Sequence, residues 1–207
     1  MKRLCVCPIT EGHGEGEAVP ALLRRVAQEI GIDYLVVTRP IRQKRDRLLS
    51  DRFDDLSRAT RLAWLKAKQM LPEGPWLVLL LVDSENECAE ASGPLGPRLR
   101  SRMREALGQD VAGCVLAHPM FETWFVAGMT AQHPLLRLRA GEEVSRAPEA
   151  DRIGKGWVKQ RMPLQRYQET IDQQRLVRFV EVSQARQRSG SFDKLCRVLE
   201  AAAKETP

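Results

Sequence analysis

Short apolar runs alternate, along the first half of the chain, with segments whose apolar residues have helical spacing. The apolar runs predict strands at 2–10, 33–38, 76–82 and 111–117. The segments between them predict helices at 17–30, 57–70 and 98–107. The run at 76–82 is apolar at every position, which is typical of a central parallel strand buried on both faces. This order predicts an α/β fold, with a parallel sheet of about four strands and helices on both faces.

The alternation stops after residue 118. Helices are expected at 120–128, 163–175 and 192–204. The polar segment 131–161 predicts no particular element. A chain of 207 residues is typical of one domain. We therefore divide it into an α/β core at 1–128 and a mainly helical C-terminal extension at 129–207 that packs on the same domain.

Composition and targeting signals exclude several classes of protein. The N-terminal residues do not predict a signal peptide, because polar residues interrupt a short apolar run and no cleavage site follows. The longest apolar run is too short to span a bilayer, so we expect no membrane partner and a cytoplasmic location. The five cysteines have no CxxC spacing and are expected to be buried free thiols. The formal net charge of +6 permits a nucleic-acid partner without requiring one.

Carboxylates follow two of the predicted strands at the points where the strands end. Glu11 comes directly after the first strand and Asp83 directly after the third, and carboxyl ends of parallel strands share one edge of a sheet. Glu15 and Glu85 lie within a few residues of this pair. Because clustered carboxylates repel each other unless a cation lies among them, we predict a site for Mg²⁺ or Mn²⁺. Taken singly, each residue is better explained structurally, Asp83 by a turn and Glu11 by a solvated position, and the prediction of a metal site depends on the group.

The densest basic stretch follows the second predicted strand and so begins at the same edge of the sheet. We expect the segment 39–55 to be a loop whose cations contact the phosphates of nucleic acid beside the metal. These cations are Arg39, Arg42, Lys44, Arg45, Arg47 and Arg52. The alternative is a solvated loop, because aspartates are interspersed among them. Lys155 and Lys159 are further candidates for phosphate contacts, with solvated lysines as the alternative.

Other polar and aromatic residues of the second half have simpler interpretations. His118 directly follows the fourth strand, where it suits an acid, a base, a ligand or a turn residue. Ser191 begins the last predicted helix and is expected to be its N-cap. Phe121, Trp124 and Phe125 have the helical spacing of core residues.

Four segments, in order, give the chain a family resemblance. ITEGHGEGEAVPALLRR at 9–25 looks like the opening of Toprim domains, in which a strand ends in Glu-Gly and a helix follows. LLLVDSENE at 79–87 resembles their second acidic motif, commonly Asp-x-Asp. With FETWF at 121–125 and Ser-Phe at 191–192, the chain resembles a Toprim-like bacterial family, domain of unknown function 4276. That family is similar to the Toprim nucleases that accompany AAA- and ABC-type ATPases.

The resemblance implies a metal-dependent phosphodiester chemistry. The implied metal ligands are Glu11, Asp83, Glu85 and Glu15. The family match also places Glu122 near the acidic edge as an accessory site residue. Glu85 departs from the usual aspartate, which puts the geometry of that ligand in question. Tyr34 reads as strand and Tyr167 as helix, so no tyrosine nucleophile of a topoisomerase is apparent.

Three functions stay open on the sequence. The first is a divalent-metal-dependent nuclease subunit, cutting DNA or RNA within an ATPase-linked phage-defence system, as the resemblance implies. The second is a non-catalytic Toprim-like interaction subunit of an ATPase complex, which the departure at Glu85 favours. The third is a small-molecule phosphohydrolase that uses the same acids. For an ATPase partner, we expect a docking surface at the short apolar patch of Val177, Phe179 and Val180, with a core position of these residues as the alternative.

Overall fold

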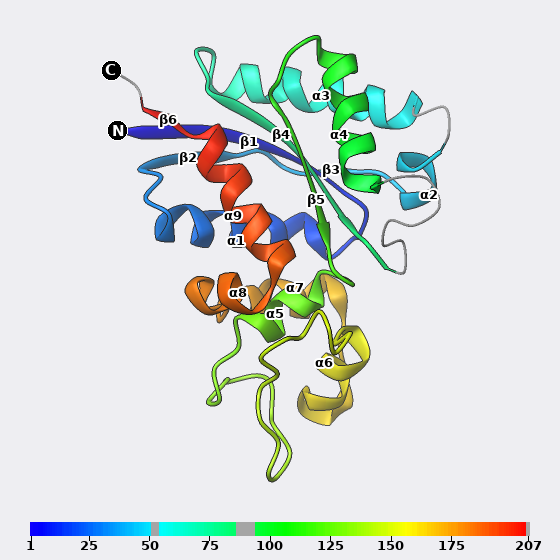
Figure 1. Cartoon of the computed structure of the whole chain (residues 1–207), viewed down its shortest axis with the longest axis vertical. Helices are drawn as coiled ribbons and strands as arrows, with labels where there is room; N and C mark the ends of the chain where they lie inside the picture. Colours follow the sequence, from blue (N-terminus) through cyan, green and yellow to red (C-terminus); the bar gives the residue numbers. More distant parts are fainter. Residues whose placement is uncertain (51–53, 86–93, 206–207) are drawn as a thin grey trace.

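The computed structural model describes residues 1–50, 54–85 and 94–205. Its centre is a parallel sheet with the strand order β2-β1-β4-β5 (Figure 1). These strands are β1 (Lys2–Thr10), β2 (Tyr34–Val37), β4 (Trp76–Asp83) and β5 (Ala112–Ala117). The α/β class and the four main strands predicted from the sequence are confirmed.

Two short strands extend the sheet at opposite ends of β1. Strand β3 (Ile41–Arg42) pairs in parallel with the last two residues of β1. Strand β6 (Lys204–Glu205) pairs antiparallel with its first two. The two ends of the described chain therefore lie side by side (Figure 1).

Four long helices cover the two faces of the sheet. Helices α1 (Glu15–Glu29) and α9 (Gly190–Ala202) lie on one face, and α3 (Asp54–Met70) and α4 (Leu95–Leu107) lie on the other (Figure 1). Gly108 ends α4 in the left-handed conformation, with φ of 66°, a backbone shape that glycine adopts without strain.

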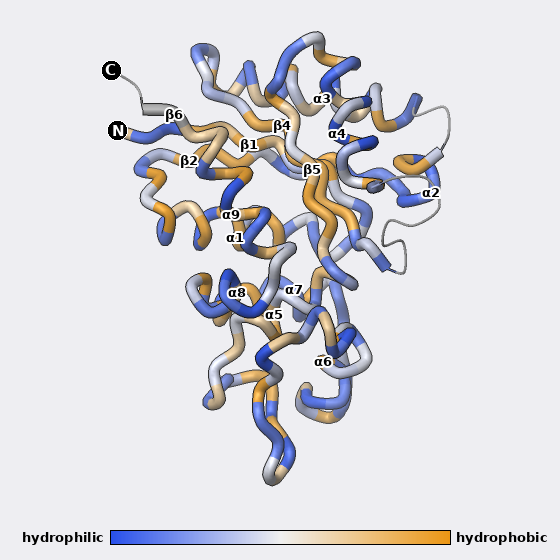
Figure 2. Tube along the Cα trace, viewed as in Figure 1, coloured by the Kyte–Doolittle hydropathy of each residue, from blue (hydrophilic) through white to orange (hydrophobic). Residues whose placement is uncertain are grey.

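Strand β4 shows why the sheet needs helices on both sides. Its side chains alternate between two core clusters, and the hydrophobic colour concentrates on the strands (Figure 2). The cluster under α1 and α9 takes Leu77, Leu79 and Leu81. The cluster under α3 and α4 takes Val78, Leu80 and Val82. The unbroken apolar run thus corresponds to a strand buried on both faces.

A layer of short helices lies beyond the carboxyl end of β5 (Figure 1). It contains α5 (Glu122–Ala127), α6 (Lys155–Arg161), the 3-10 turn η1 (Pro163–Gln165), α7 (Glu169–Val177) and α8 (Val182–Arg188). Residues 128–154 connect α5 to α6 through turns and bends, without a helix or strand. The aromatic residues Phe121, Trp124 and Phe125 are buried, as their spacing predicts, in the same core cluster as α1 and α9.

The segment 39–55 is not a loop, which corrects the sequence prediction. It contains β3 and a short helix, α2 (Arg45–Leu48), and α3 already begins at Asp54. Ile41 pairs beside Ile9 of β1, and Leu48 is fully buried against the sheet. Ile41 and Leu48 attach this segment to the sheet, but they lie among many charged residues and are too far apart to form a periodic pattern in the sequence.

Three predictions about the second half of the chain are also wrong. The helix expected at 163–175 begins only at Glu169, because Leu164 and Gln165 take left-handed φ values of 57° and 50°. Tyr167 therefore precedes α7 and is not helical. The expected docking patch is largely core: Val177 and Val180 are buried, and the half-exposed Phe179 packs on a histidine ring.

Cys5, Cys7, Cys114 and Cys196 are free and buried, as expected. Cys88, together with Arg52 and Glu87, lies outside the described residues. Across the described ranges, we find no helix with both the length and the apolar character needed to cross a membrane.

Candidate metal centre

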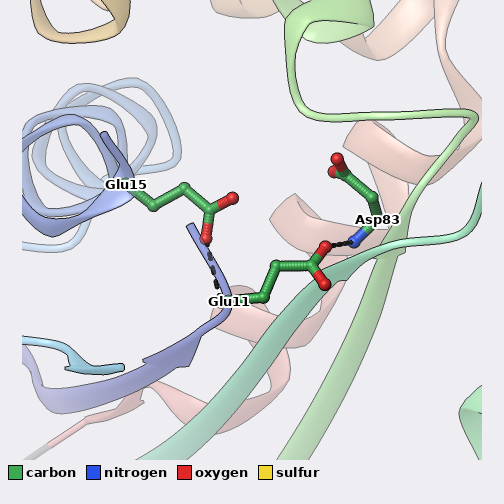
Figure 3. A group of neighbouring side chains, drawn as sticks. All are labelled: Glu11, Glu15 and Asp83. Carbon is green, nitrogen blue, oxygen red and sulfur yellow. Dashed lines mark hydrogen bonds between the residues drawn. The ribbon is translucent and has the colours of Figure 1, made fainter. Parts of the chain in front are cut away.

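Three carboxylates meet at the carboxyl edge of the sheet (Figure 3). Glu11 directly follows β1, Asp83 is the last residue of the adjacent β4, and Glu15 is the first residue of α1. One oxygen from each lies within 4.8 Å of the other two. The neighbouring positions of Glu11 and Asp83 follow from the parallel pairing of β1 with β4, as the sequence predicts.

Backbone N–H groups position these carboxylates. The N–H of Asp83 donates to Glu11 Oε1 at 2.6 Å, and the N–H of Phe121 donates to Asp83 Oδ1 at 2.7 Å. Glu15 Oε2 accepts from the N–H groups of Glu11 and Gly12 at 3.2 and 3.1 Å. A Cβ on Gly12 would stand 2.8 Å from Glu15 Oε1, so a side chain at this turn would displace the Glu15 carboxylate from its position.

Burial without sufficient counter-charge raises the pKa of all three carboxyl groups. For Glu15, burial raises the pKa to about 7, and the charges of Glu11 and Glu122 add to the effect. Burial and the charges of Glu15 and Glu11 raise the pKa of Asp83 well above its ordinary range. Burial also raises the pKa of Glu11, although the N–H of Asp83 and the Arg45 guanidinium oppose it. A cation bound among these groups would compensate their negative charge and so favour their ionised forms.

A pocket of about 420 Å³ surrounds the three carboxylates. Its acidic lining residues are Glu11, Glu15, Asp46, Asp83, Glu85, Glu122 and Glu169. Its basic lining residues are Lys44, Arg45 and Lys155. Seven carboxylates against three cations leave an excess of negative charge built from hard oxygen donors. The donor set therefore fits Mg²⁺ or Mn²⁺, the ions that carboxylate oxygens favour, better than it fits a phosphate alone.

Glu85 does not join the cluster of Glu11, Glu15 and Asp83. Its side chain is 62% exposed, and its Oε2 lies 3.7 Å from Arg45 Nε at the rim of the pocket. The longer side chain at this position thus reaches a cation of the protein. The role predicted for Glu85 as a metal ligand stays a prediction that this geometry does not favour.

The predicted phosphate-binding cations divide into two groups. Lys44, Arg45 and Lys155 line the acidic pocket, where Lys155 forms an ion pair with Glu169. The others are exposed and do not line it. They are Arg39, Arg42, Arg47 and Lys159.

Glu122 enters the pocket from the first turn of α5 and is 4% exposed. Its Oε1 accepts hydrogen bonds from Tyr167 Oη at 2.8 Å and from Gln173 Nε2 at 3.2 Å. Burial and the charge of Glu122 raise the pKa of the Tyr167 hydroxyl, so it stays a hydrogen-bond donor. Sequence reasoning missed Tyr167, Gln173 and Glu169, because they reach the pocket from the C-terminal extension and no local motif marks them.

His118 and Ser191 belong to a separate network that does not line the acidic pocket. His118 Nδ1 lies 2.7 Å from Ser84 Oγ, and the backbone N–H of His118 donates to Ser191 Oγ. Ser191 Oγ also accepts from the Trp124 indole N–H at 2.7 Å. The expected N-cap role of Ser191 is wrong, because Ser189 caps α9 by accepting from the N–H of Phe192. Ser191 thus joins α9 to β5 and α5.

Comparison with protein-family models matches residues 10–200 to the family described as Domain of unknown function (DUF4276). The match covers most of the chain, including all of the carboxylates described above. Neither the curated proteins nor the solved structures contain a match.

Proposed function

The chain belongs to the DUF4276 family, and we propose that it is a divalent-metal-dependent nuclease subunit that hydrolyses phosphodiester bonds. The observation that carries the proposal is the convergence of Glu11, Glu15 and Asp83 in one pocket. The excess of negative charge in that pocket would repel nucleic acid, so substrate binding there needs a metal ion. A Toprim relationship is part of the proposal, and the order of its acidic motifs along β1 and β4 supports it.

Glu11, Asp83 and Glu15 would hold the ion. Bound Mg²⁺ or Mn²⁺ would supply an activated water and stabilise charge on the phosphate. The chain's own groups have separate tasks. The backbone N–H groups of Asp83, Gly12 and Phe121 fix the carboxylates before any ion arrives, which avoids reorganisation on binding.

The cations at the pocket's rim would position the nucleic-acid backbone. Lys44 and Arg45 line the pocket beside the carboxylates, and the exposed Arg39, Arg42 and Arg47 lie in or next to β3 and α2. Phosphate contacts of this kind carry no information about base sequence. We therefore expect DNA or RNA to be gripped through its backbone.

The partner and the cellular setting of the proposed nuclease rest on the resemblance to Toprim proteins. We expect an AAA- or ABC-type ATPase to license cutting, within a phage-defence system in the cytoplasm. On this basis, the isolated chain should have weak nuclease activity or none. The assay is cleavage of DNA and RNA by the purified chain in Mn²⁺, with and without a co-purified ATPase.

Metal binding tests the proposal most directly. In calorimetry, Mn²⁺ should bind the wild-type protein, and Asp83→Asn should weaken that binding at least about tenfold, about 1.4 kcal/mol. The matched control is Asp33→Asn, because Asp33 contacts Lys2 at the opposite edge of the sheet. Equal Mn²⁺ binding by the wild-type protein and the Asp83 variant would contradict the proposed site.

One observation favours a non-catalytic interaction subunit as a second candidate. Glu85, the second acid of the motif, lies beside Arg45 and outside the cluster. A centre with fewer carboxylates could keep a structural ion and lose hydrolysis. Mn²⁺ binding together with no cleavage, even with a co-purified ATPase, would select this candidate.

A further inference from the structure

Helix α2 brings Arg45 into the acidic pocket between two carboxylates. Arg45 Nε lies 3.9 Å from Glu11 Oε2 and 3.7 Å from Glu85 Oε2. Only 16% of the Arg45 side chain is exposed, which is unusual for a long cation on a four-residue helix. A positive charge of the protein is thus already present where a carboxylate would bind a metal ion.

The position of Arg45 is fixed by the fold. Leu48, at the other end of α2, is fully buried in the core cluster under α3 and α4. The N–H of Leu48 donates to the carbonyl of Lys44 at 3.1 Å, which closes the turn that carries Arg45. Arg47, on the same helix, is exposed and does not line the pocket. The two arginines therefore differ in their surroundings and not in their helix.

The contacts of Arg45 Nε with Glu11 and Glu85 are longer than hydrogen bonds, which are about 2.7–3.2 Å for N–H···O. The attraction of Nε to these two carboxylates is therefore one of charge, which another anion can also supply. A divalent cation at Glu11 would repel the nearby guanidinium. The phosphate of a diester is an anion with the geometry that arginine binds best, and it would compensate both cations at once.

We propose that Arg45 is a built-in counter-ion of the acidic pocket, which opposes divalent-cation binding at Glu11 and contacts the phosphate of a bound phosphodiester. This inference rests on the proposed function and assigns Arg45 a part in it. Metal and diester then each strengthen the binding of the other, because coupling between two ligands is reciprocal.

The first measurement is Mn²⁺ affinity at low ionic strength, by calorimetry on the full chain. Arg45→Gln should bind Mn²⁺ about tenfold more tightly than the wild-type protein, about 1.4 kcal/mol. Arg197→Gln carries the same change of net charge on α9, where Arg197 is exposed and does not line the acidic pocket, and should differ from wild type by less than about twofold. Arg45→Lys keeps the charge and should stay near the wild-type affinity. Thermal melts of each variant establish that it is folded.

The second measurement repeats the Mn²⁺ titration with millimolar diethyl phosphate, a stable diester without base or sugar. The diester should tighten Mn²⁺ binding by the wild-type protein and by Arg197→Gln. It should tighten Mn²⁺ binding by Arg45→Gln less than it does for the wild-type protein, because only the direct attraction between metal and diester then links the two ligands.

The outcomes separate this inference from the function on which it rests. Tighter Mn²⁺ binding by Arg45→Gln together with a smaller diester effect supports the counter-ion role. Mn²⁺ binding that is unchanged or weaker in Arg45→Gln overturns that role and leaves the metal centre in place. An absence of Mn²⁺ binding by the wild-type protein overturns both.

Discussion

Replacing Glu15 by glutamine should make the metal-free protein more stable at neutral and alkaline pH. Burial raises the pKa of this carboxyl from 4.5 to about 7. Each pKa unit corresponds to about 1.4 kcal/mol, so ionising Glu15 costs the folded state about 3 kcal/mol relative to the unfolded chain. Glutamine has no proton to lose, and its carbonyl oxygen can still accept from the N–H groups of Glu11 and Gly12.

The effect has a defined pH window. Below pH 4.5, the carboxyl is protonated in both states and contributes no pH dependence. Between pH 4.5 and about 7, the folded state keeps the proton and the unfolded state loses it, so the free energy of unfolding falls as pH rises. The stability of Glu15→Gln relative to wild type should therefore grow by about 3 kcal/mol from pH 4.5 to pH 8.

Urea denaturation in EDTA, followed by tryptophan fluorescence, measures this difference at several pH values. The matched control is Glu17→Gln, because Glu17 lies in the same first turn of α1 and is exposed. Mn²⁺ should reverse the order at pH 8, since it stabilises the protein that keeps the carboxylate. A difference between Glu15→Gln and wild type that does not change with pH would refute the reasoning from burial and charge.

Three further substitutions test the packing around the pocket, each by chemical denaturation. Gly14→Ala should reduce the free energy of unfolding by about 1–3 kcal/mol through overpacking, because its Cβ would stand 2.5 Å from the backbone carbonyl oxygen of Glu169. Gly16→Ala, with open space around its Cβ, should be neutral or stabilising, and equal effects of the two changes would contradict the contact at Gly14. Leu48→Ala should reduce the free energy of unfolding by about 2–5 kcal/mol, because it truncates a buried core residue. A reduction below about 0.5 kcal/mol would favour the interpretation of segment 39–55 as a solvated loop. Ser191→Ala should reduce the free energy of unfolding by about 1–3 kcal/mol, because its hydrogen bonds are lost. It should leave Mn²⁺ affinity unchanged, and a weaker affinity would mean that Ser191 contributes to the metal centre.

The features of this structure that the sequence predicts follow from hydrophobic periodicity and from the order of the strands. The unbroken apolar run of β4 specifies a strand buried on both faces, and a parallel sheet then places Glu11 and Asp83 at one edge. This reasoning does not predict that Leu48 is buried, because a single leucine among charged residues forms no periodic pattern. It also does not predict the contacts of Tyr167 and Gln173 with Glu122, because these contacts span 45 and 51 residues of chain and arise only from the packing of the folded protein.

The antiparallel pairing of β6 with the start of β1 sets the distance between the chain ends and the pocket. Glu11 follows the other end of β1, a strand of nine residues. At about 3.3 Å per residue, roughly 30 Å separates the pocket from the two ends of the described chain. A fluorophore, an affinity tag or a fused protein attached at either end is therefore held at the far margin of the sheet, and leaves the approach to the carboxylates open.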